Sequence, residues 1–239
     1  MIGKKLMWLA PVLMLLLASH AVAANGGGTR GHWGEDQIFR FDLGSFEPEA
    51  DSQYWSDKAA DFTGDSGDFD DAAIGIEWVR FLGDRLGLAF SGSFYEGAAR
   101  QEYLRFEDQF GAPIRHTTEL DISSFTLGLL VHLAQRDRAL VPYVGLGGGV
   151  WAWRLREFGD FIDFTTADFE IFDDFFEDEG GALGYYWRAG LEAPIATNWS
   201  VYAEGRWQRV DDELGSDFEG LGELDLSGRT LSAGLSVSF

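Results

Sequence analysis

Residues 223–239 read ELDLSGRTLSAGLSVSF, and this stretch decides the fold. From position 231 onward, apolar residues alternate with small or polar ones, which is typical of a strand with one apolar and one wettable face. The segment ends on an aromatic residue with no polar tail behind it. We therefore predict the closing strand of a β-barrel, paired with both the first and the seventh strands. Its lipid-facing residues are predicted to be Leu231, Ala233, Leu235, Val237 and Phe239, with Ser232, Gly234, Ser236 and Ser238 facing the lumen.

The first residues have the features of a secretory signal peptide. Lys4 and Lys5 precede an apolar run over residues 6–18, and Ala21-Val22-Ala23 supplies small residues for cleavage. We predict a cleaved signal over residues 1–23, a flexible Gly-rich leader over 24–35 and one domain over 36–239. The chain is therefore expected to be exported.

Composition limits how an exported chain of this kind can be stabilised. It contains no cysteine, so disulfides play no part. After the signal, no apolar run approaches the roughly 18 residues of a transmembrane helix. A membrane-embedded mature chain would therefore have to be a closed barrel, because only helices and barrels satisfy their backbone groups in lipid.

Alternation of apolar and small or polar residues predicts eight strands. They cover residues 36–45, 72–81, 86–96, 120–133, a segment from 141, 183–193, a segment from 199, and 223–239. The glycines at 147–149 leave the parity of the fifth strand open, because they could host a bulge.

The connections between these strands differ in length in a regular way. Long polar segments (46–71, 97–118, 157–181 and 211–222) alternate with tight turns near 82–85, 134–138 and 196–198. Outer-membrane barrels have short periplasmic turns and long outer loops, whereas a soluble β-sandwich has no reason to separate the two. The predicted fold class is all-β: an eight-stranded antiparallel up-and-down transmembrane β-barrel with short periplasmic turns and long acidic extracellular loops.

The formal net charge of the full chain is −22. Nucleic-acid binding requires Lys and Arg to neutralise phosphates, so this charge argues against such a partner. It favours exposed acidic loops that attract cations or basic molecules.

Three segments carry a resemblance to a known family: PYVGLGGG at residues 142–149, YAEGRW at 202–207 and the terminal LSVSF at 235–239. They resemble the outer-membrane β-barrel superfamily of small porin-like, OmpA- and OmpX-like proteins. The resemblance implies location in the outer membrane of a Gram-negative bacterium, lipid contact and recognition of the terminal aromatic strand by the barrel-assembly machinery. It implies no particular activity, because the superfamily contains structural, adhesive and enzymatic members.

Several charged residues fall on the face opposite lipid. An eight-stranded barrel is just wide enough for its own side chains to fill it, so mixed charges inside should pair into a plug. A narrow solute path is the alternative. The predicted lumen charge network comprises Arg40, Asp42, Glu77, Arg188, Glu192, Glu204 and Arg206.

The third long connection, residues 157–179, interleaves phenylalanines with acids. So many phenylalanines cannot all be solvated, which predicts a self-packed loop or a surface for an extracellular ligand. Their spacing of about three to four residues suits a short amphipathic helix. The candidate interaction residues are Phe158, Phe161, Phe164, Phe169, Phe172 and Phe176.

Metal and catalytic signals are weaker. Asp61, Asp65, Asp68 and Asp70 supply hard oxygen ligands for a candidate Ca²⁺ site, but their spacing does not match an EF-hand. His116 and His132 are the histidines considered for catalysis, and neither lies in a recognisable motif.

These patterns favour a non-enzymatic barrel without a cofactor, a structural scaffold of the outer membrane that displays acidic surface loops. A small cation-selective porin is the alternative. A lipid-modifying enzyme, of the kind that uses His with Ser and a carboxylate, is the third hypothesis.

Overall fold

The computed structural model describes residues 37–136, 138–166 and 169–239. The predicted signal peptide and leader, residues 1–23 and 24–35, lie outside this part of the chain. Within it, the helices are all too short or too polar to cross a membrane.

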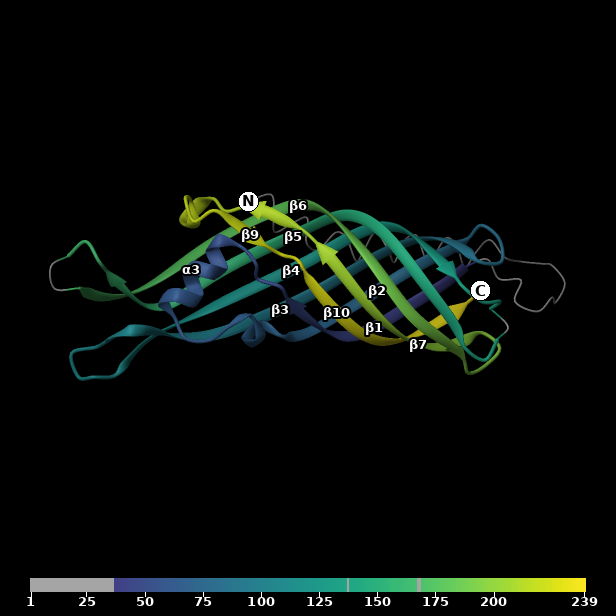
Figure 1. Ribbon diagram of the computed structural model, residues 1–239, viewed down its shortest axis with the longest axis horizontal. Helices are drawn as coiled ribbons and strands as arrows, with labels where there is room; N and C mark the ends of the chain where they lie inside the picture. The colour runs from purple at the N-terminus through teal and green to yellow at the C-terminus, as the bar shows by residue number, and fades with distance from the viewer. Residues whose placement is uncertain (1–36, 137, 167–168) are drawn as a thin grey trace.

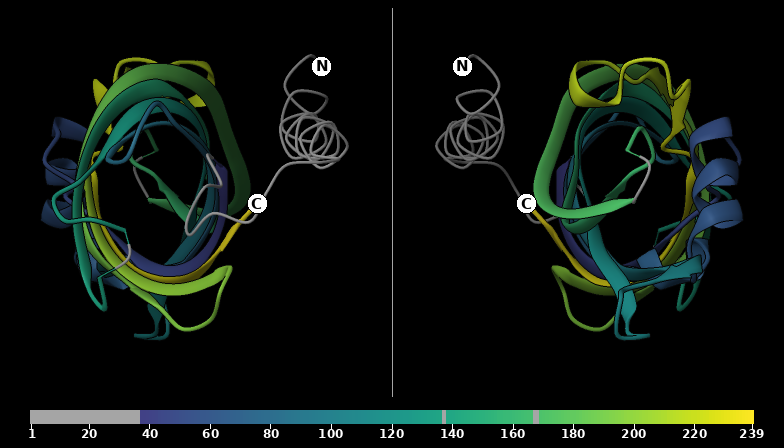
Figure 2. Two further views of the ribbon diagram at one scale, coloured as in Figure 1. Left: turned by 90° about the vertical axis from the view of Figure 1, so that its right-hand side faces the viewer. Right: turned by 90° about the vertical axis from the view of Figure 1, so that its left-hand side faces the viewer.

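Eight antiparallel strands close into a barrel in the ring order β1-β10-β7-β6-β5-β4-β3-β2 (Figure 1). Seen along its axis, the ring is oval (Figure 2). The predicted fold class is confirmed. The strands are β1 (Gln37–Pro48), β2 (Asp71–Phe81), β3 (Leu86–Glu107), β4 (Pro113–His132), β5 (Val141–Asp163), β6 (Glu170–Pro194), β7 (Trp199–Arg209) and β10 (Gly228–Ser238).

The terminal strand closes the ring as predicted. β10 pairs with both β7 and β1, and Leu235 lies opposite Val201 on one side and Phe41 on the other. Leu231 and Leu235 are 71% and 45% exposed on the outer face, whereas Ser232 and Ser236 are buried inside. The prediction was wrong for the start of the stretch: Glu223–Asp225 forms a separate strand, β9, paired with β8 (Asp211–Glu213). Alternation fails there, because Leu224, Leu226 and the intervening Asp225 are all buried.

The strands have very unequal lengths. β1, β2, β7 and β10 have 11 or 12 residues, whereas β3 to β6 have 20 to 25. The barrel is therefore closed at the end that carries the carboxy terminus, the turn end. Beyond it, β3 to β6 continue as an open four-stranded sheet to the opposite hairpin end (Figure 1).

This extension corrects two sequence expectations. Much of 97–118 and 157–181 was expected to be loop, and the Phe-rich segment a short helix. Both segments are hairpins that continue the barrel ladder, with pairs running out to Glu107 opposite Pro113 and Asp163 opposite Glu170. A short isolated helix must pay for its own nucleation, whereas a strand that prolongs an existing ladder does not. The glycines at 147–149 host no bulge, since the β4–β5 register is continuous through them.

Two connections cover the open side of the sheet. The first contains α3 (Gln53–Asp61) and the turn η1 (Ser66–Phe69); the second contains β8, the turn η2 (Ser216–Phe218) and β9. Their buried side chains form one apolar cluster with the inner face of the long strands. Its members include Phe46, Tyr54, Trp55, Phe69, Tyr95, Leu120, Trp151, Trp153, Leu155, Phe218, Leu224 and Leu226.

Large apolar side chains are exposed in a band around the closed half of the barrel. Trp187 and Trp207 stack on its outer face with ring centroids 3.9 Å apart, as expected for an aromatic girdle at a membrane interface. Along β4 and into the turn after it, the band extends from Phe125 to Leu133, so the part of β4 before Ser123 lies outside the band. The band includes Phe41, Leu43, Ile74, Phe94, Phe125, Leu127, Leu129, Leu146, Val150, Leu183, Leu191, Leu231 and Leu235.

Candidate functional site

A row of alternating charges crosses the lumen near the turn end. Arg40, from β1, is 1% exposed and pairs with Glu192 of β6 and, at 3.5 Å, with Glu77 of β2. The Arg40 guanidinium carbon also lies 4.7 Å from the ring centroid of Tyr143. Ser236 of the terminal strand donates a 2.8 Å hydrogen bond to Glu192. The first arginine is thus held by three strands at once.

Arg188 continues the row from β6. Its Nη1 lies 2.7 Å from Glu77 Oε2 and 3.3 Å from Glu204 Oε2, and Tyr143 donates a 2.9 Å hydrogen bond to Glu204. Glu77 therefore joins both arginines. The order Glu192, Arg40, Glu77, Arg188, Glu204 links β1, β2, β6 and β7 across the lumen, and buried charges in such a row compensate one another's desolvation.

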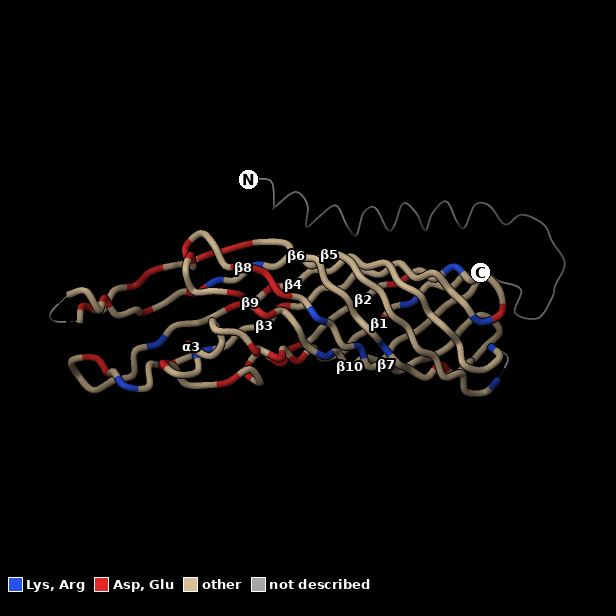
Figure 3. Tube along the Cα trace, turned by 45° about the horizontal axis from the view of Figure 1, so that its top comes forward, with Lys and Arg blue, Asp and Glu red and all other residues tan. Residues whose placement is uncertain are grey.

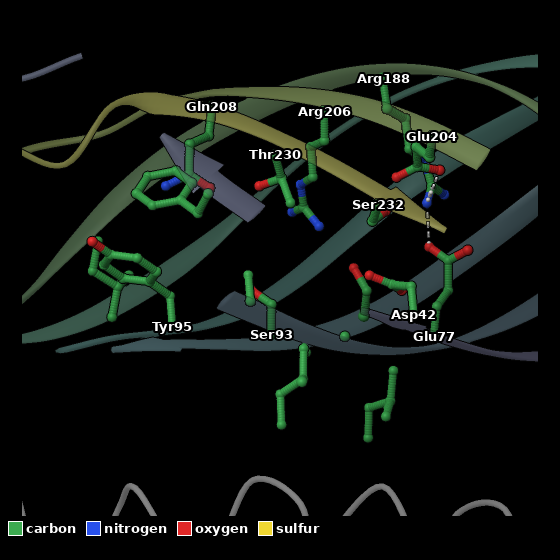
Figure 4. A pocket seen from close by; sticks show the side chains of 18 of the residues that line it. Asp42, Glu77, Ser93, Tyr95, Arg188, Glu204, Arg206, Gln208, Thr230 and Ser232 are labelled. Atoms are coloured by element: carbon green, nitrogen blue, oxygen red, sulfur yellow. Dashed lines mark hydrogen bonds and ion pairs between the residues drawn. The ribbon is translucent and has the colours of Figure 1, made fainter. Parts of the chain in front are cut away.

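The other two predicted lumen residues lie outside this row. Asp42 accepts a 2.9 Å hydrogen bond from Tyr202, and Arg206 donates to Thr126 over 3.3 Å while its guanidinium lies 3.8 Å from the Tyr186 ring centroid. Among the described residues, neither makes an ion pair. Figure 4 shows both directed into a chamber of about 50 Å³, which has room for a few waters. Its other polar lining includes Ser91, Ser93, Gln208, Thr230 and Ser232.

An aromatic layer covers the chamber on its hairpin side. Trp151 is fully buried and donates a 3.2 Å hydrogen bond to Gln208, and Phe46 meets Tyr95 edge to face at 4.8 Å. These residues line the chamber and belong to the large apolar cluster above it. The lumen is thus filled at two levels, by charge pairs near the turn end and by an apolar core towards the hairpin end.

A second buried polar cluster lies outside the membrane band, beneath α3. Glu157 of β5 accepts a 2.6 Å hydrogen bond from Tyr54 and pairs with Lys58 at 2.8 Å. The Lys58 ammonium also lies 2.9 Å from Nε2 of His116 in β4. Sequence reasoning missed this cluster of Tyr54, Lys58, His116 and Glu157, because its members are far apart in the chain and only the fold of the first connection brings α3 onto β4 and β5.

Burial sets the protonation of this cluster. Desolvation lowers the pKa of Lys58, although the Glu157 carboxylate opposes the shift, and burial raises the pKa of Tyr54 well above its usual range. Burial also lowers the pKa of His116 to about 4, and the neighbouring Lys58 ammonium acts in the same direction. His116 is therefore neutral in the folded protein at pH 7 and can accept a hydrogen bond from Lys58.

We expect acidification to destabilise the part of the structure that lies outside the membrane band, on the hairpin side, which we call the outer half. Between about pH 6.5 and pH 4, unfolded His116 binds a proton that the folded side chain does not, so stability falls as pH falls through this window, by up to about 3 kcal/mol. The protection factors of α3 amides, which correct for the slowing of intrinsic exchange at lower pH, should fall between pH 7 and pH 5. The change should be much smaller in His116→Gln, and an equal change in both proteins would contradict the assignment.

The Phe-rich residues divide between the core and the surface. Phe161 is 8% exposed, stacks on His116 at 5.3 Å and meets Phe176 at 4.9 Å. Phe164 and Phe169, at the tip, are 54% and 50% exposed. Phe172 lies at the edge of the buried group, and Phe158 is half-buried. Exposed aromatic surface therefore extends from the tip along β6 as far as Phe175, which is 52% exposed.

The four aspartates of the candidate Ca²⁺ site do not converge. Asp61 pairs with Arg105, whereas Asp65 and Asp68 exchange hydrogen bonds in a capping box around η1. Over the described ranges, no three metal-ligating side chains of the His, Cys, Asp and Glu types gather in one place. Asp70 follows η1 at its carboxy-terminal end.

The two histidines considered for catalysis lie in different environments. His116 is in the cluster beneath α3, whereas His132 ends β4 at the turn end, 3.7 Å from Glu192. Sixteen residues of one strand separate them by about 50 Å. They therefore cannot belong to one active site.

A closed eight-stranded barrel with an apolar outer band defines an integral outer-membrane protein. In agreement, residues 10–239 match the family described as outer membrane protein beta-barrel domain, and the chain belongs to this family. The predicted location in the outer membrane of a Gram-negative bacterium is thereby confirmed, with lipid as the surroundings of the band. A search of curated proteins found no match.

Several solved structures are similar to this chain at low sequence identity. The outer membrane protein OprG from Pseudomonas aeruginosa is 15% identical, with 87% of this chain and 98% of that chain covered and a TM-score of 0.53. Neisserial surface protein A is 14% identical, with coverages of 85% and 97% and a TM-score of 0.45. Outer membrane protein W of E. coli is 13% identical, with coverages of 87% and 100% and a TM-score of 0.40.

Proposed function

We propose that this protein is a closed, non-enzymatic scaffold of the outer membrane that presents its acidic outer hairpins to the surroundings of the cell. The observation that carries the proposal is the filled lumen. Glu77 joins Arg40 and Arg188 across the interior, and fully buried Trp151 lies in the layer above. An eight-stranded barrel leaves little space beyond what such side chains occupy.

The outer half supports the presentation part of the proposal. The four longest strands carry two hairpins away from the membrane, and acidic residues gather at this end (Figure 3). In the lumen the charges compensate one another, whereas at the hairpin tips most carboxylates face water. A structural role alone requires no such projecting acidic surface.

A small cation-selective porin is the second candidate. The observation in its favour is the polar chamber, which is lined by Asp42 and serines and lies directly beside the charge row. Ion conduction would require the charge row and the aromatic layer to open at the same time.

Conductance in planar bilayers separates the two candidates. The purified, folded protein should give no discrete conductance steps, because both filled levels must open for ions to pass. Heat-modifiable migration on gels should confirm in the same preparation that the barrel is folded. Reproducible cation-selective steps from folded protein would refute the closed scaffold and establish the porin.

The terminal strand has a separate proposed role during insertion. We propose that Leu231, Leu235, Val237 and Phe239 form the signal read by the barrel-assembly machinery. Phe239 supports this role: its backbone N–H donates to the carbonyl of Gln37, so the signal lies at the seam where the last strand pairs with the first.

A further inference from the structure

The two outer hairpins separate at a defined point and leave a cleft between them. Pairing of β4 with β5 ends at His116 opposite Gly159, beyond which the β3–β4 and β5–β6 hairpins continue independently. Gly159 has φ +128°, and a side chain there would meet the backbone of Arg115 and His116. This glycine permits the close approach of the two strands where the β4–β5 pairing ends. Beyond that pairing, the two hairpins diverge (Figure 1).

The hairpin cleft has a volume of about 640 Å³, within the range of known ligand pockets. Its apolar lining comes from both hairpins. Ile114 and Ile162 form buried parts of its wall, whereas Phe169 and Ile171 are 50% and 39% exposed. The lining residues are Phe106–Gln109, Pro113, Ile114, Asp160, Ile162 and Phe169–Ile171.

Aromatic contacts tie the two hairpins together at the edge of the cleft. The ring of Phe106, from β3, lies 5.3 Å from Phe164 and 6.0 Å from Phe169, both from the opposite tip. Across the gap, the backbone N–H of Ile162 donates a 3.4 Å hydrogen bond to the hydroxyl oxygen of Tyr103. Contacts between the two hairpins thus form one edge of the cleft. The apolar lining next to these contacts remains exposed to solvent.

The charges of the cleft are all of one sign. Glu107, Asp108, Asp160 and Glu170 line it, and none of them makes an ion pair within the described part of the chain. The arginines that flank the lining residues in sequence are already engaged, Arg105 by Asp61 and Arg115 by Glu102 at 2.6 Å. Four uncompensated carboxylates around an apolar floor are complementary to a ligand that is both cationic and apolar.

We propose that the hairpin cleft binds a short basic peptide segment of an external protein, in which Lys or Arg residues alternate with apolar ones. The apolar side chains pack on Phe106, Phe169 and Ile171, and the cations lie against the four carboxylates. Several carboxylates favour a ligand with several cations over one with a single charge. This inference rests on the proposed presentation of the hairpins, and it adds the chemistry of the partner.

The test uses the full-length mature protein in nanodiscs of zwitterionic lipid, with binding measured by calorimetry. The probe is an acetylated, amidated pentapeptide in which three lysines alternate with two leucines. It should bind, and its affinity should fall with rising salt. Two matched peptides, one with glutamates replacing the lysines and one with glycines replacing the leucines, should bind at least tenfold more weakly.

A matched pair of protein variants locates the binding. Neutralising the cleft with Glu107→Gln, Asp108→Asn, Asp160→Asn and Glu170→Gln should weaken binding of the probe at least tenfold. The control neutralises four exposed carboxylates elsewhere on the outer half: Asp57→Asn, Glu213→Gln, Glu219→Gln and Glu223→Gln. It should retain binding within about twofold, and Phe169→Ser should weaken binding without changing the net charge.

Three results would overturn the proposal. These are no binding of the probe by folded protein, equal weakening in the cleft and control variants, and equal affinity for the lysine–glycine peptide. The second would show general attraction to an acidic surface. Empty nanodiscs correct for lipid binding. The conductance measurement on the same preparation reports on the closed lumen independently, so failure of the cleft and failure of the scaffold proposal are distinguishable.

Discussion

Replacing Glu77 with alanine is expected to lower the free energy of unfolding by about 3 kcal/mol, the lower end of the range for breaking a buried ion pair. Glu77 is 3% exposed and is the carboxylate shared by Arg40 and Arg188. Its loss leaves two buried guanidinium groups facing each other, although each keeps one further carboxylate. Urea unfolding in phospholipid vesicles measures the change.

Two comparisons sharpen this prediction. Glu96→Ala removes an exposed carboxylate of β3 and should change stability by less than about 0.5 kcal/mol. Adding Arg188→Met to Glu77→Ala should cost less than the two single changes together, because the second substitution removes one of the unpaired charges. A Glu77→Ala effect as small as that of Glu96→Ala would show that the charge row does not stabilise the barrel.

The second large effect is expected outside the membrane. Lys58→Met keeps a long apolar stem but leaves Glu157 buried without its cation, at a cost of about 3 kcal/mol to the docking of α3. Proteolysis within residues 49–71 should then become about a hundredfold faster, since cleavage follows the population of the opened segment. The heat-modifiable migration of the barrel should be unchanged.

The neighbouring residue supplies a control for this experiment. Asp57→Asn alters an exposed charge on the same helix and should leave the cleavage rate as in the natural protein. Combining Lys58→Met with Glu157→Gln should recover part of the protection, because the buried charge is gone. Unchanged proteolysis in Lys58→Met would mean that apolar packing alone holds α3.

The closed half of the fold could be predicted from sequence because lipid and lumen impose a strict period of two. Leu231 and Leu235 on one face, and Ser232 and Ser236 on the other, obey it in the structure. Beyond the membrane this constraint ends. The consecutive residues Asp225 and Leu226 are both buried, so the sequence does not alternate there. The lengths of β3 to β6 were underestimated in the same region of the molecule.

The site was predictable to the same extent. Alternation along the strands identified Arg40, Glu77 and Arg188 as lumen residues. It gives no information on the position of a side chain along the barrel axis, so it could not predict which of these residues would pair. The Lys58–Glu157 pair spans almost a hundred positions and depends on how one connection folds over the sheet. The hairpin cleft required knowledge of where the β4–β5 ladder ends, which Gly159 marks but does not by itself reveal.

Because the strands have unequal lengths, one half of the molecule along the barrel axis is surrounded by lipid and the other half by water. The turn half is held by lipid and by a complete ring of backbone hydrogen bonds, whereas the hairpin half has a water-facing exterior and an apolar core under α3, β8 and β9. The hydrophobic effect acts on the second half as it does in a soluble protein. Moderate urea should therefore melt the outer half first and leave an intact ring in the membrane, so that a single unfolding free energy does not describe the chain.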